Sequence, residues 1–80
     1  MTLQIILPDG THFENQVTSL TVPLMDGLAG IMNNHCPMLA RLKDGKVTGK
    51  DGAKQFEYQV RNAFVQVLNN KITILADAAY

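Results

Sequence analysis

VQVLNNKITI, residues 65–74, is the stretch that most clearly decides the fold. Two valines alternate with a glutamine before the pair Asn69-Asn70, and two isoleucines alternate with a threonine after it. Because successive side chains of a strand point to opposite faces, each half presents one apolar face. Asparagine is also the commonest non-glycine residue in the left-handed conformation that a tight hairpin turn requires. The stretch therefore predicts a β-hairpin that packs one face on a core.

Further turn signals divide the rest of the chain in the same way. Asp9-Gly10, Asp44-Gly45 and Asp51-Gly52 are each flanked by residues able to extend, which is a strong hairpin signal. No window of roughly eleven or more residues keeps the apolar spacing of an amphipathic helix. The sequence thus predicts one all-β domain over residues 1–80, a two-sheet antiparallel sandwich or flattened barrel. Its other strands are expected at residues 3–7, 11–15, 17–22, 38–42, 45–48 and 54–60.

Composition excludes several classes of partner. The 80 residues are 46% hydrophobic and 18% charged, the balance of a chain that folds around a core. Seven basic and seven acidic residues give a net charge of zero, so no basic field is available for nucleic acid. The first apolar run, residues 3–7, is too short for a signal sequence or a membrane span. With one cysteine and no internal disulfide, we expect a cytosolic chain that reaches a membrane only through another protein.

His35 and Cys36 are the obvious candidates for chemistry, because imidazole and thiolate bind zinc and also serve as base and nucleophile. Neighbouring side chains of an extended segment point apart, however, and the other histidine, His12, lies on a different expected strand. A small zinc enzyme built on these three residues is therefore the least favoured alternative. We instead expect Cys36 to be a buried small apolar side chain and His35 to make a loop hydrogen bond.

Other catalytic and ligand-binding patterns are missing. The one serine, Ser19, has no elbow glycines around it, and no glycine-rich phosphate loop precedes a helix. The aspartates fall in Asp-Gly turns, where a carboxylate serves turn geometry. The sequence therefore predicts a non-catalytic protein without metal, cofactor or small-molecule ligand. Met25, Met32 and Met38 suit an adaptable docking surface, with packing at the core edge as the alternative.

The run GLAGIMNNHCPML, residues 27–39, resembles a recognisable segment of the epsilon subunit of F-type ATP synthases. KITILADAA, residues 71–79, looks like the last strand of the amino-terminal domain of that family. The resemblance covers essentially the whole chain and implies a sandwich of about ten short strands. The positions that match the family in the first run are Gly27, Gly30, Ile31, His35, Pro37 and Leu39, with Cys36 where the family often has alanine.

Three departures from the family pattern have physical consequences. The Pro-Gly pairs of the family are Asn33-Asn34 and Asn69-Asn70 here, so we expect asparagine to adopt the positive φ that glycine otherwise supplies. Its paired glycines before the penultimate strand are Asn62-Ala63, where the asparagine can do likewise but the alanine cannot do so cheaply. Leu28 replaces an acidic residue common in the family, and Asp26 is the nearest carboxylate that could take its place.

The resemblance implies a mechanical role at the foot of a rotary central stalk. In that family the domain packs against the gamma subunit, touches the loops of the membrane-embedded c-ring and rotates with both. It thereby couples proton flow through the ring to ATP synthesis in the catalytic head. The residues implied in the c-ring contact are Asp26, Gly27 and Leu28, with His35 near them, and those implied in the gamma contact are His35, Ala40 and Met32.

The family's sandwich normally continues into a helical hairpin that can inhibit ATP hydrolysis, and this chain ends at Tyr80, before that hairpin. We therefore expect a peripheral protein on the cytoplasmic face of the bacterial inner membrane that couples but does not inhibit. The alternative is a free-standing β-sandwich adaptor of another assembly. The two differ in what co-purifies, because only the first predicts a gamma-like partner.

Overall fold

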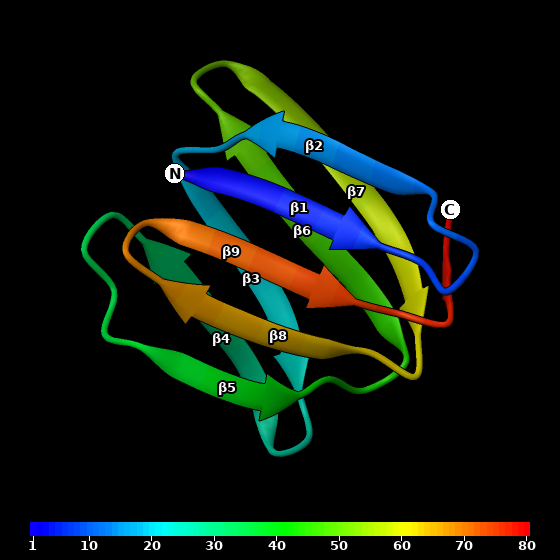
Figure 1. The fold of residues 1–80 in the computed structure, drawn as a ribbon. Helices are drawn as coiled ribbons and strands as arrows, with labels where there is room; N and C mark the ends of the chain where they lie inside the picture. The colour runs from blue at the N-terminus through cyan, green and yellow to red at the C-terminus, as the bar shows by residue number, and fades with distance from the viewer.

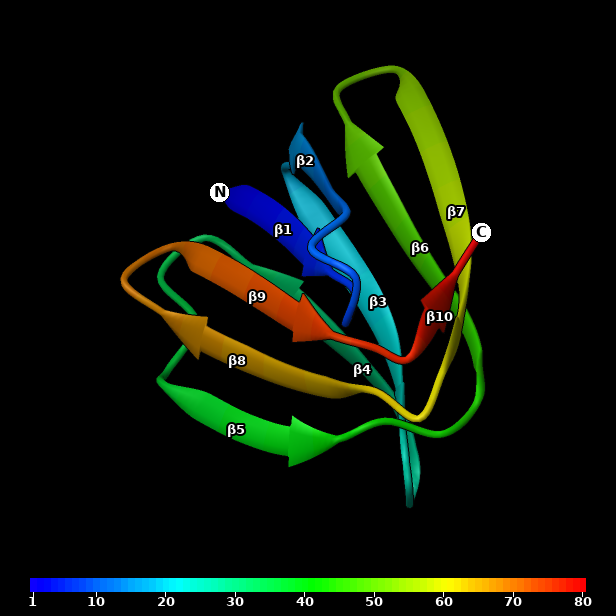
Figure 2. The same ribbon diagram turned by 45° about the vertical axis from the view of Figure 1, so that its right-hand side comes forward.

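The computed structural model consists of ten strands in two five-stranded sheets and contains no helix. The first sheet has the order β2-β1-β9-β8-β5 and the second has the order β10-β7-β6-β3-β4. The sheets face each other, with their strands crossing at an angle (Figure 1), and Figure 2 shows the two layers from the side. Every pairing is antiparallel except that of β1 with β9. The predicted two-sheet β-sandwich is confirmed.

The strand bounds follow the predicted ranges to within a few residues wherever a strand was expected. In the first sheet the strands are β1 (Thr2–Ile6), β2 (His12–Gln16), β5 (Met38–Arg41), β8 (Phe64–Leu68) and β9 (Lys71–Leu75). In the second sheet they are β3 (Ser19–Leu24), β4 (Gly27–Met32), β6 (Gly45–Asp51), β7 (Lys54–Arg61) and β10 (Ala78–Ala79).

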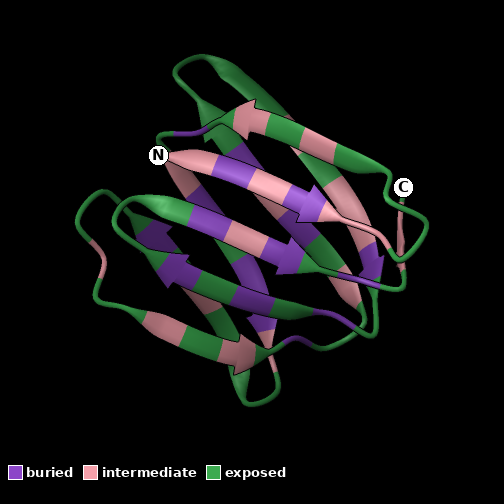
Figure 3. Cartoon of the chain, in the orientation of Figure 1, coloured by how far each residue is buried: buried purple, intermediate pink, exposed green.

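The core lies between the sheets and is entirely apolar. Fifteen hydrophobic residues are buried, and no polar or charged residue is. Buried positions alternate with exposed ones along β8, and with exposed or half-buried ones along β9, as Figure 3 shows in purple, green and pink. Burial of alternate aliphatic side chains from both sheets, at roughly 25 cal/mol per Å² of apolar surface, drives the two layers together.

Asparagine supplies the left-handed backbone at the predicted positions. Leu68 pairs with Lys71, so Asn69 and Asn70 form a two-residue loop, with φ of 51° and 60°. Positive φ at both positions is the signature of a type I′ turn, whose twist matches that of the strands. Asn34 has φ of 65° and Asn62 has φ of 51°. The alanine after Asn62 does not need a positive φ and is buried instead.

Two of the three Asp-Gly pairs mark hairpins, and the third prediction is wrong. Gly10 has φ of 91° in the β1–β2 turn, and Gly52 has φ of 63° in the β6–β7 turn. Asp44-Gly45 instead lies where the chain passes from β5 in the first sheet to β6 in the second. The Asp44 carboxylate there accepts a hydrogen bond from the backbone N–H of Asn62 at 2.9 Å. A dipeptide with turn propensity does not by itself distinguish a hairpin from a crossing between sheets.

Strand β4 was not expected from the sequence analysis, which placed no strand between residues 22 and 38. The structure pairs all six residues of β4 with β3. Ile31 points into the core, whereas Leu28 and Met32 point outward and are exposed. Because both faces of β4 are apolar and two glycines interrupt it, no alternation is visible in the sequence.

The carboxy-terminal segment is two strands rather than the single one that the resemblance suggested over residues 71–79. β9 ends at Leu75, and the chain then crosses to the second sheet, where β10 pairs with β7. The two residues at the crossing, Ala76 and Asp77, keep backbone hydrogen bonds to carbonyl oxygens of Ile6 and Arg61.

The two long sides of the sandwich are closed differently. Beside β2 and β7 the rings of Phe13 and Tyr58 stack with centroids 5.3 Å apart, and Asn15 Nδ2 donates to the Tyr58 hydroxyl. The Phe56 ring covers Gly49, where any side chain would overlap it. The opposite side, formed by edge strands β4 and β5 and here called the open side, has one isolated backbone bridge from Leu24 to Leu42. Exposed apolar residues gather along that open side.

Candidate functional site

The β3–β4 hairpin extends beyond the sandwich at the end of the open side (Figure 1). Leu24 pairs with Gly27, so the loop consists of Met25 and Asp26 alone. Gly27 has φ of 143°, a backbone region that residues with side chains rarely adopt. Met25 is 58% exposed and Asp26 is exposed as well. The tip therefore presents one flexible apolar side chain and one carboxylate to solvent.

Strand β4 presents apolar side chains on the outer face of the second sheet. Leu28 lies opposite Pro23 and is 76% exposed, and Met32 is 66% exposed. Pro23 has no N–H to offer, and it lies beyond Thr21, where the pairing of β3 with β6 ends. No charged residue lies on β4. Edge strands of soluble proteins usually carry a charge or a proline that discourages pairing, and β4 has neither.

The β4–β5 loop, residues 33–37, holds His35 by local hydrogen bonds. The backbone N–H of His35 donates to the carbonyl of Met32 at 3.2 Å. Its ring Nδ1 lies 2.7 Å from the carbonyl of Cys36, and because a carbonyl only accepts, Nδ1 carries a proton in this bond. In the neutral ring, Nε2 is then the acceptor that a partner could use. The predicted loop hydrogen bond of His35 is confirmed.

His35 does not lie near the hairpin tip, contrary to the expectation that grouped it with Asp26, Gly27 and Leu28. The tip begins β4, whereas His35 follows its other end. A six-residue strand places those ends about 17 Å apart at about 3.3 Å per residue. The proposed contact residues therefore form two separate clusters, one at each end of β4.

Cys36 is exposed, so its predicted burial is wrong. The loop that carries it passes outside both sheets on its way from β4 to β5, and four of its five residues are exposed. His12 lies on β2, at the edge of the first sheet opposite β5, which is about 19 Å away at about 4.8 Å per strand. The three residues of the zinc-enzyme alternative are therefore not brought together, and no group of three His, Cys, Asp or Glu residues could hold a metal ion.

The residues implied in a gamma contact wrap around the edge of the sandwich rather than forming one flat face. Met32 points outward from the second sheet, and Ala40 packs partly against the core from β5. Leu39, its neighbour, points outward from the first sheet and is 75% exposed, and Leu68 on β8 is exposed beside it. Sequence reasoning missed Leu39 and Leu68 as surface residues. Their exposure depends on which face of the first sheet is covered, which alternation alone does not say.

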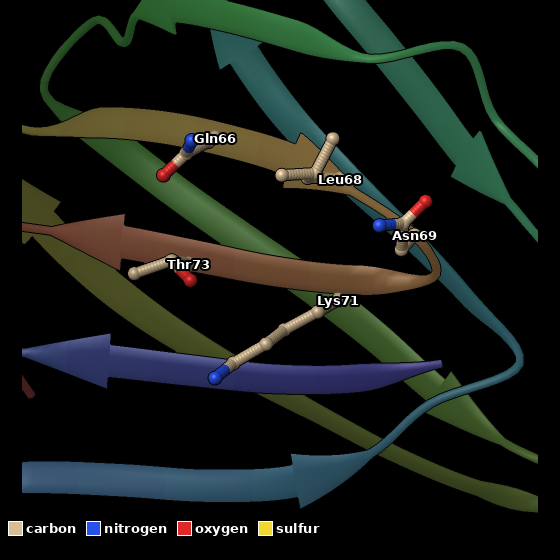
Figure 4. A pocket seen from close by; sticks show the side chains of 5 residues that line it. All are labelled: Gln66, Leu68, Asn69, Lys71 and Thr73. Carbon is tan, nitrogen blue, oxygen red and sulfur yellow. The ribbon is translucent and has the colours of Figure 1, made fainter.

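The outer face of the first sheet is hollowed over β8 and β9. Figure 4 shows the hollow, about 370 Å³ in volume, lined by Gln66, Leu68, Asn69, Lys71 and Thr73. One of these five residues is hydrophobic, whereas small-molecule sites are predominantly apolar and aromatic. The hollow offers hydrogen-bonding groups and one ammonium group on an open surface.

One carboxyl group has a perturbed pKa, and it lies in a turn. The Thr11 backbone N–H donates to Asp9 Oδ1 at 2.8 Å and lowers the pKa of the Asp9 carboxyl below its usual value of 3.8. This is the Asx-turn bond that the Asp-Gly signal predicts. Asp9 belongs to the β1–β2 turn, on the side of the sandwich away from β4.

Comparison with known sequences identifies close relatives over the whole chain. The family model described as the beta-sandwich domain of the ATP synthase delta/epsilon chain matches residues 1–80. The ATP synthase epsilon chain of Symbiobacterium thermophilum is 40% identical over 80 residues, which are 99% of this chain and 58% of that protein. The epsilon chain of Chlorobium limicola is 37% identical over 76 residues, which are 94% of this chain and 86% of that protein. The chain thus spans a little over half the length of its first relatives.

Comparison with solved structures identifies the same fold at low identity. A chain of the Euglena gracilis mitochondrial ATP synthase, in a structure of its OSCP/F1/c-ring part, superposes with a TM-score of 0.88 at 21% identity. That match covers 98% of this chain and 51% of the other. A chain of the central stalk and c-ring structure of the Tetrahymena thermophila enzyme superposes with a TM-score of 0.81 at 13% identity, over 99% of this chain and 64% of the other.

Proposed function

Because the chain belongs to the family of ATP synthase delta/epsilon chains through its β-sandwich domain, we propose that it is a non-catalytic subunit of the central stalk of an F-type ATP synthase. Its role is to couple rotation of the c-ring to the gamma shaft. The observation that carries this role is the charge-free edge strand β4, with exposed apolar residues at both ends. Such an edge is suited to burial against other subunits.

The hairpin tip is the proposed c-ring contact. Asp26, Gly27 and Leu28 stand at the far end of the β3–β4 hairpin, which extends beyond the end of the sandwich toward any partner lying there. The Asp26 carboxylate offers an acceptor for donors on a loop of the partner, and Met25 and Leu28 offer apolar contact.

The other end of β4 is the proposed gamma contact. Met32, His35 and Ala40 lie around the edge between the two sheets, with the exposed Leu39 next to them. Methionine and leucine supply the apolar area, and His35 Nε2 supplies one directed acceptor. A contact of this kind at each end of β4 would let one rigid sandwich transmit torque between two neighbours.

The place of the protein follows from these partners. The structure contains no helix that is long and apolar enough to cross a membrane. We infer attachment at the cytoplasmic face of the bacterial inner membrane through the c-ring and gamma, without insertion of this domain into the bilayer.

The decisive experiment is affinity capture of the tagged chain from its native membranes, followed by mass spectrometry. We expect gamma and the c-ring subunit among the retained proteins. Leu28→Glu places a charge in the proposed c-ring contact and His35→Ala removes the proposed gamma acceptor, so each should weaken retention of its own partner about tenfold, the size of an ordinary hot spot.

Matched substitutions separate contact from general damage. Gln55→Glu adds the same charge on β7, and His12→Ala removes the other imidazole from β2. Both positions are exposed and lie on the side of the sandwich opposite the open side. Both should retain the partners like the unmodified chain. Capture of another complex without any ATP synthase subunit would contradict the proposal and favour a free-standing adaptor.

A further inference from the structure

Two loops that are far apart in sequence are joined by asparagine side chains at the end of the sandwich near the amino terminus. The backbone N–H of Asn34 donates to Asn70 Oδ1 at 2.7 Å. In return Asn70 Nδ2 donates to Asn34 Oδ1 at 3.5 Å. The first residue belongs to the β4–β5 loop and the second to the β8–β9 turn.

Both asparagines adopt a backbone conformation that glycine adopts with less strain, with φ of 65° at Asn34 and 60° at Asn70. A glycine at either place would satisfy the turn, but it would not make the hydrogen bonds between the loops. The side chain of Asn70 therefore does something beyond turn geometry. It joins the first sheet, through β8 and β9, to the loop that leaves the second sheet.

The β4–β5 loop has few other means of being held. Its remaining backbone bond, from the His35 N–H to Met32, lies within the loop and its own strand. The only other long-range bond is a weak one, 3.5 Å from the amino-terminal ammonium group of Met1 to Asn33 Oδ1. The Asn34 N–H is thus the strongest link between this loop and the first sheet, and His35 is the next residue.

We propose that Asn70 is a positioning residue for His35, which it orients by accepting the hydrogen bond of the Asn34 backbone N–H. The consequence for assembly rests on the proposed gamma contact of His35. The ordering of the loop does not, because it follows from the hydrogen bonds within this chain.

The first test measures hydrogen exchange of the Asn34 amide by NMR in the 80-residue chain. Asn70→Gly keeps the positive φ but deletes the acceptor, and exchange of this amide should become about fivefold faster, as expected for the loss of one ordinary hydrogen bond. Asn70→Asp keeps an acceptor oxygen and should exchange at nearly the rate of the unmodified chain. Asn69→Gly changes the same turn without touching the loop and should leave the rate unchanged. An unchanged rate in Asn70→Gly, or an equal increase in Asn69→Gly, would overturn the proposal.

The second test asks whether His35 is placed by this bond. The ¹⁵N relaxation of the His35 backbone should report greater mobility in Asn70→Gly and restored order in Asn70→Asp. If the His35 backbone stays equally ordered in Asn70→Gly, Asn70 does not position it.

Titration with purified gamma distinguishes this idea from the proposed function. Asn70→Gly should weaken binding less than His35→Ala does, and the double variant should bind no more weakly than His35→Ala alone, because Asn70 acts through His35. Additive losses would overturn the positioning role. Failure of the unmodified chain to bind gamma would contradict the proposed function, while the two NMR tests would still decide whether Asn70 orders the loop.

Discussion

The two ends of β4 both carry proposed contacts, yet they are held in different ways. At the hairpin tip, Leu24 pairs with Gly27, and neither loop residue makes a side-chain hydrogen bond. At the other end, the β4–β5 loop is joined by side chains to a turn 36 residues away. The tip is placed by strand register, and the loop is placed by long-range side-chain bonds.

This difference shows what each kind of contact site needs. A two-residue hairpin inherits its position from the ladder beneath it, so its side chains are available for a partner. A loop that crosses between sheets has no ladder, because its two strands belong to different hydrogen-bonded layers. It requires bonds from a third segment to have a defined position. Substitutions should therefore act on the two ends through different residues.

The largest expected effect comes from truncating the one fully buried side chain of β4. Ile31, the next-to-last residue of β4, is fully buried on the core-facing side of the strand. Ile31→Ala should lower the free energy of unfolding by about 2–5 kcal/mol, from lost burial and the cavity left behind. Urea unfolding followed by circular dichroism measures this. Met32→Ala, at the exposed neighbour, should change stability by no more than about 0.5 kcal/mol. Similar losses in both variants would mean that β4 is not anchored through one face.

A smaller effect is expected at Gly27, in the hairpin tip. Its φ of 143° is strained for any residue with a side chain, although no atom lies within 4 Å of where a Cβ would stand. Gly27→Ala should therefore lower the free energy of unfolding by about 1–3 kcal/mol, through backbone strain alone. Gly30→Ala, in the same strand with an ordinary φ and equally open space, is the control and should be neutral or slightly stabilising. Asn34 amide exchange should rise in Gly27→Ala no more than global destabilisation requires.

A second asparagine tests whether crossings between sheets are generally held by side chains. Asn62 has φ of 51°; its Nδ2 donates to Asp77 Oδ2 at 2.6 Å, and its Oδ1 accepts from the Arg41 guanidinium at 3.4 Å. Asn62→Gly keeps the backbone conformation and should lower the free energy of unfolding by about 1 kcal/mol, because each exposed hydrogen bond contributes little. Asn62→Ala should cost more, since alanine is strained at this φ. Equal stability of the glycine variant and the unmodified chain would restrict side-chain anchoring to the β4–β5 loop.

The smallest effect is expected at a loop with only a local bond. The folded-state pKa of the Asp9 carboxyl lies below 3.8, because the charged form accepts the Thr11 N–H. Its stabilisation is therefore fully present above pH 3.8 and is lost as pH falls through the folded-state pKa. Asp9→Asn keeps an acceptor but does not titrate, so its urea midpoint should fall slightly less than that of the unmodified chain between about pH 5 and pH 2. A steeper fall in the variant would contradict the sign of the shift.

Several features of this fold could be predicted from single residues. The pair Asn69-Asn70 predicted a tight hairpin turn, and both residues have positive φ. Asn34 and Asn62 were expected to replace glycine, and each does so. These predictions succeed because the left-handed conformation is a property of one residue and its nearest neighbours. The family could also be recognised from the sequence, since the match to the sandwich domain runs over residues 1–80.

Other features depend on which segments meet. β4 escaped prediction because Leu28 and Met32 are as apolar as the residues that β4 buries, and nothing local says which face is covered. Cys36 is exposed because its loop runs outside both sheets, although its residue type is usually buried. Asp44-Gly45 has the composition of a hairpin turn but connects two sheets.

The sequence by itself determined an all-β chain, the positions of its asparagine turns and its family, because alternation and turn geometry act over a few residues. Only the tertiary structure decided that β4 is an edge strand with an apolar outer face, that the proposed contacts lie at its opposite ends, and that Asn34 meets Asn70. The physical reason is the separation along the chain of the residues that decide each feature. Exposure and hydrogen bonds between loops depend on segments tens of residues away, and a local pattern carries no record of where those segments fold.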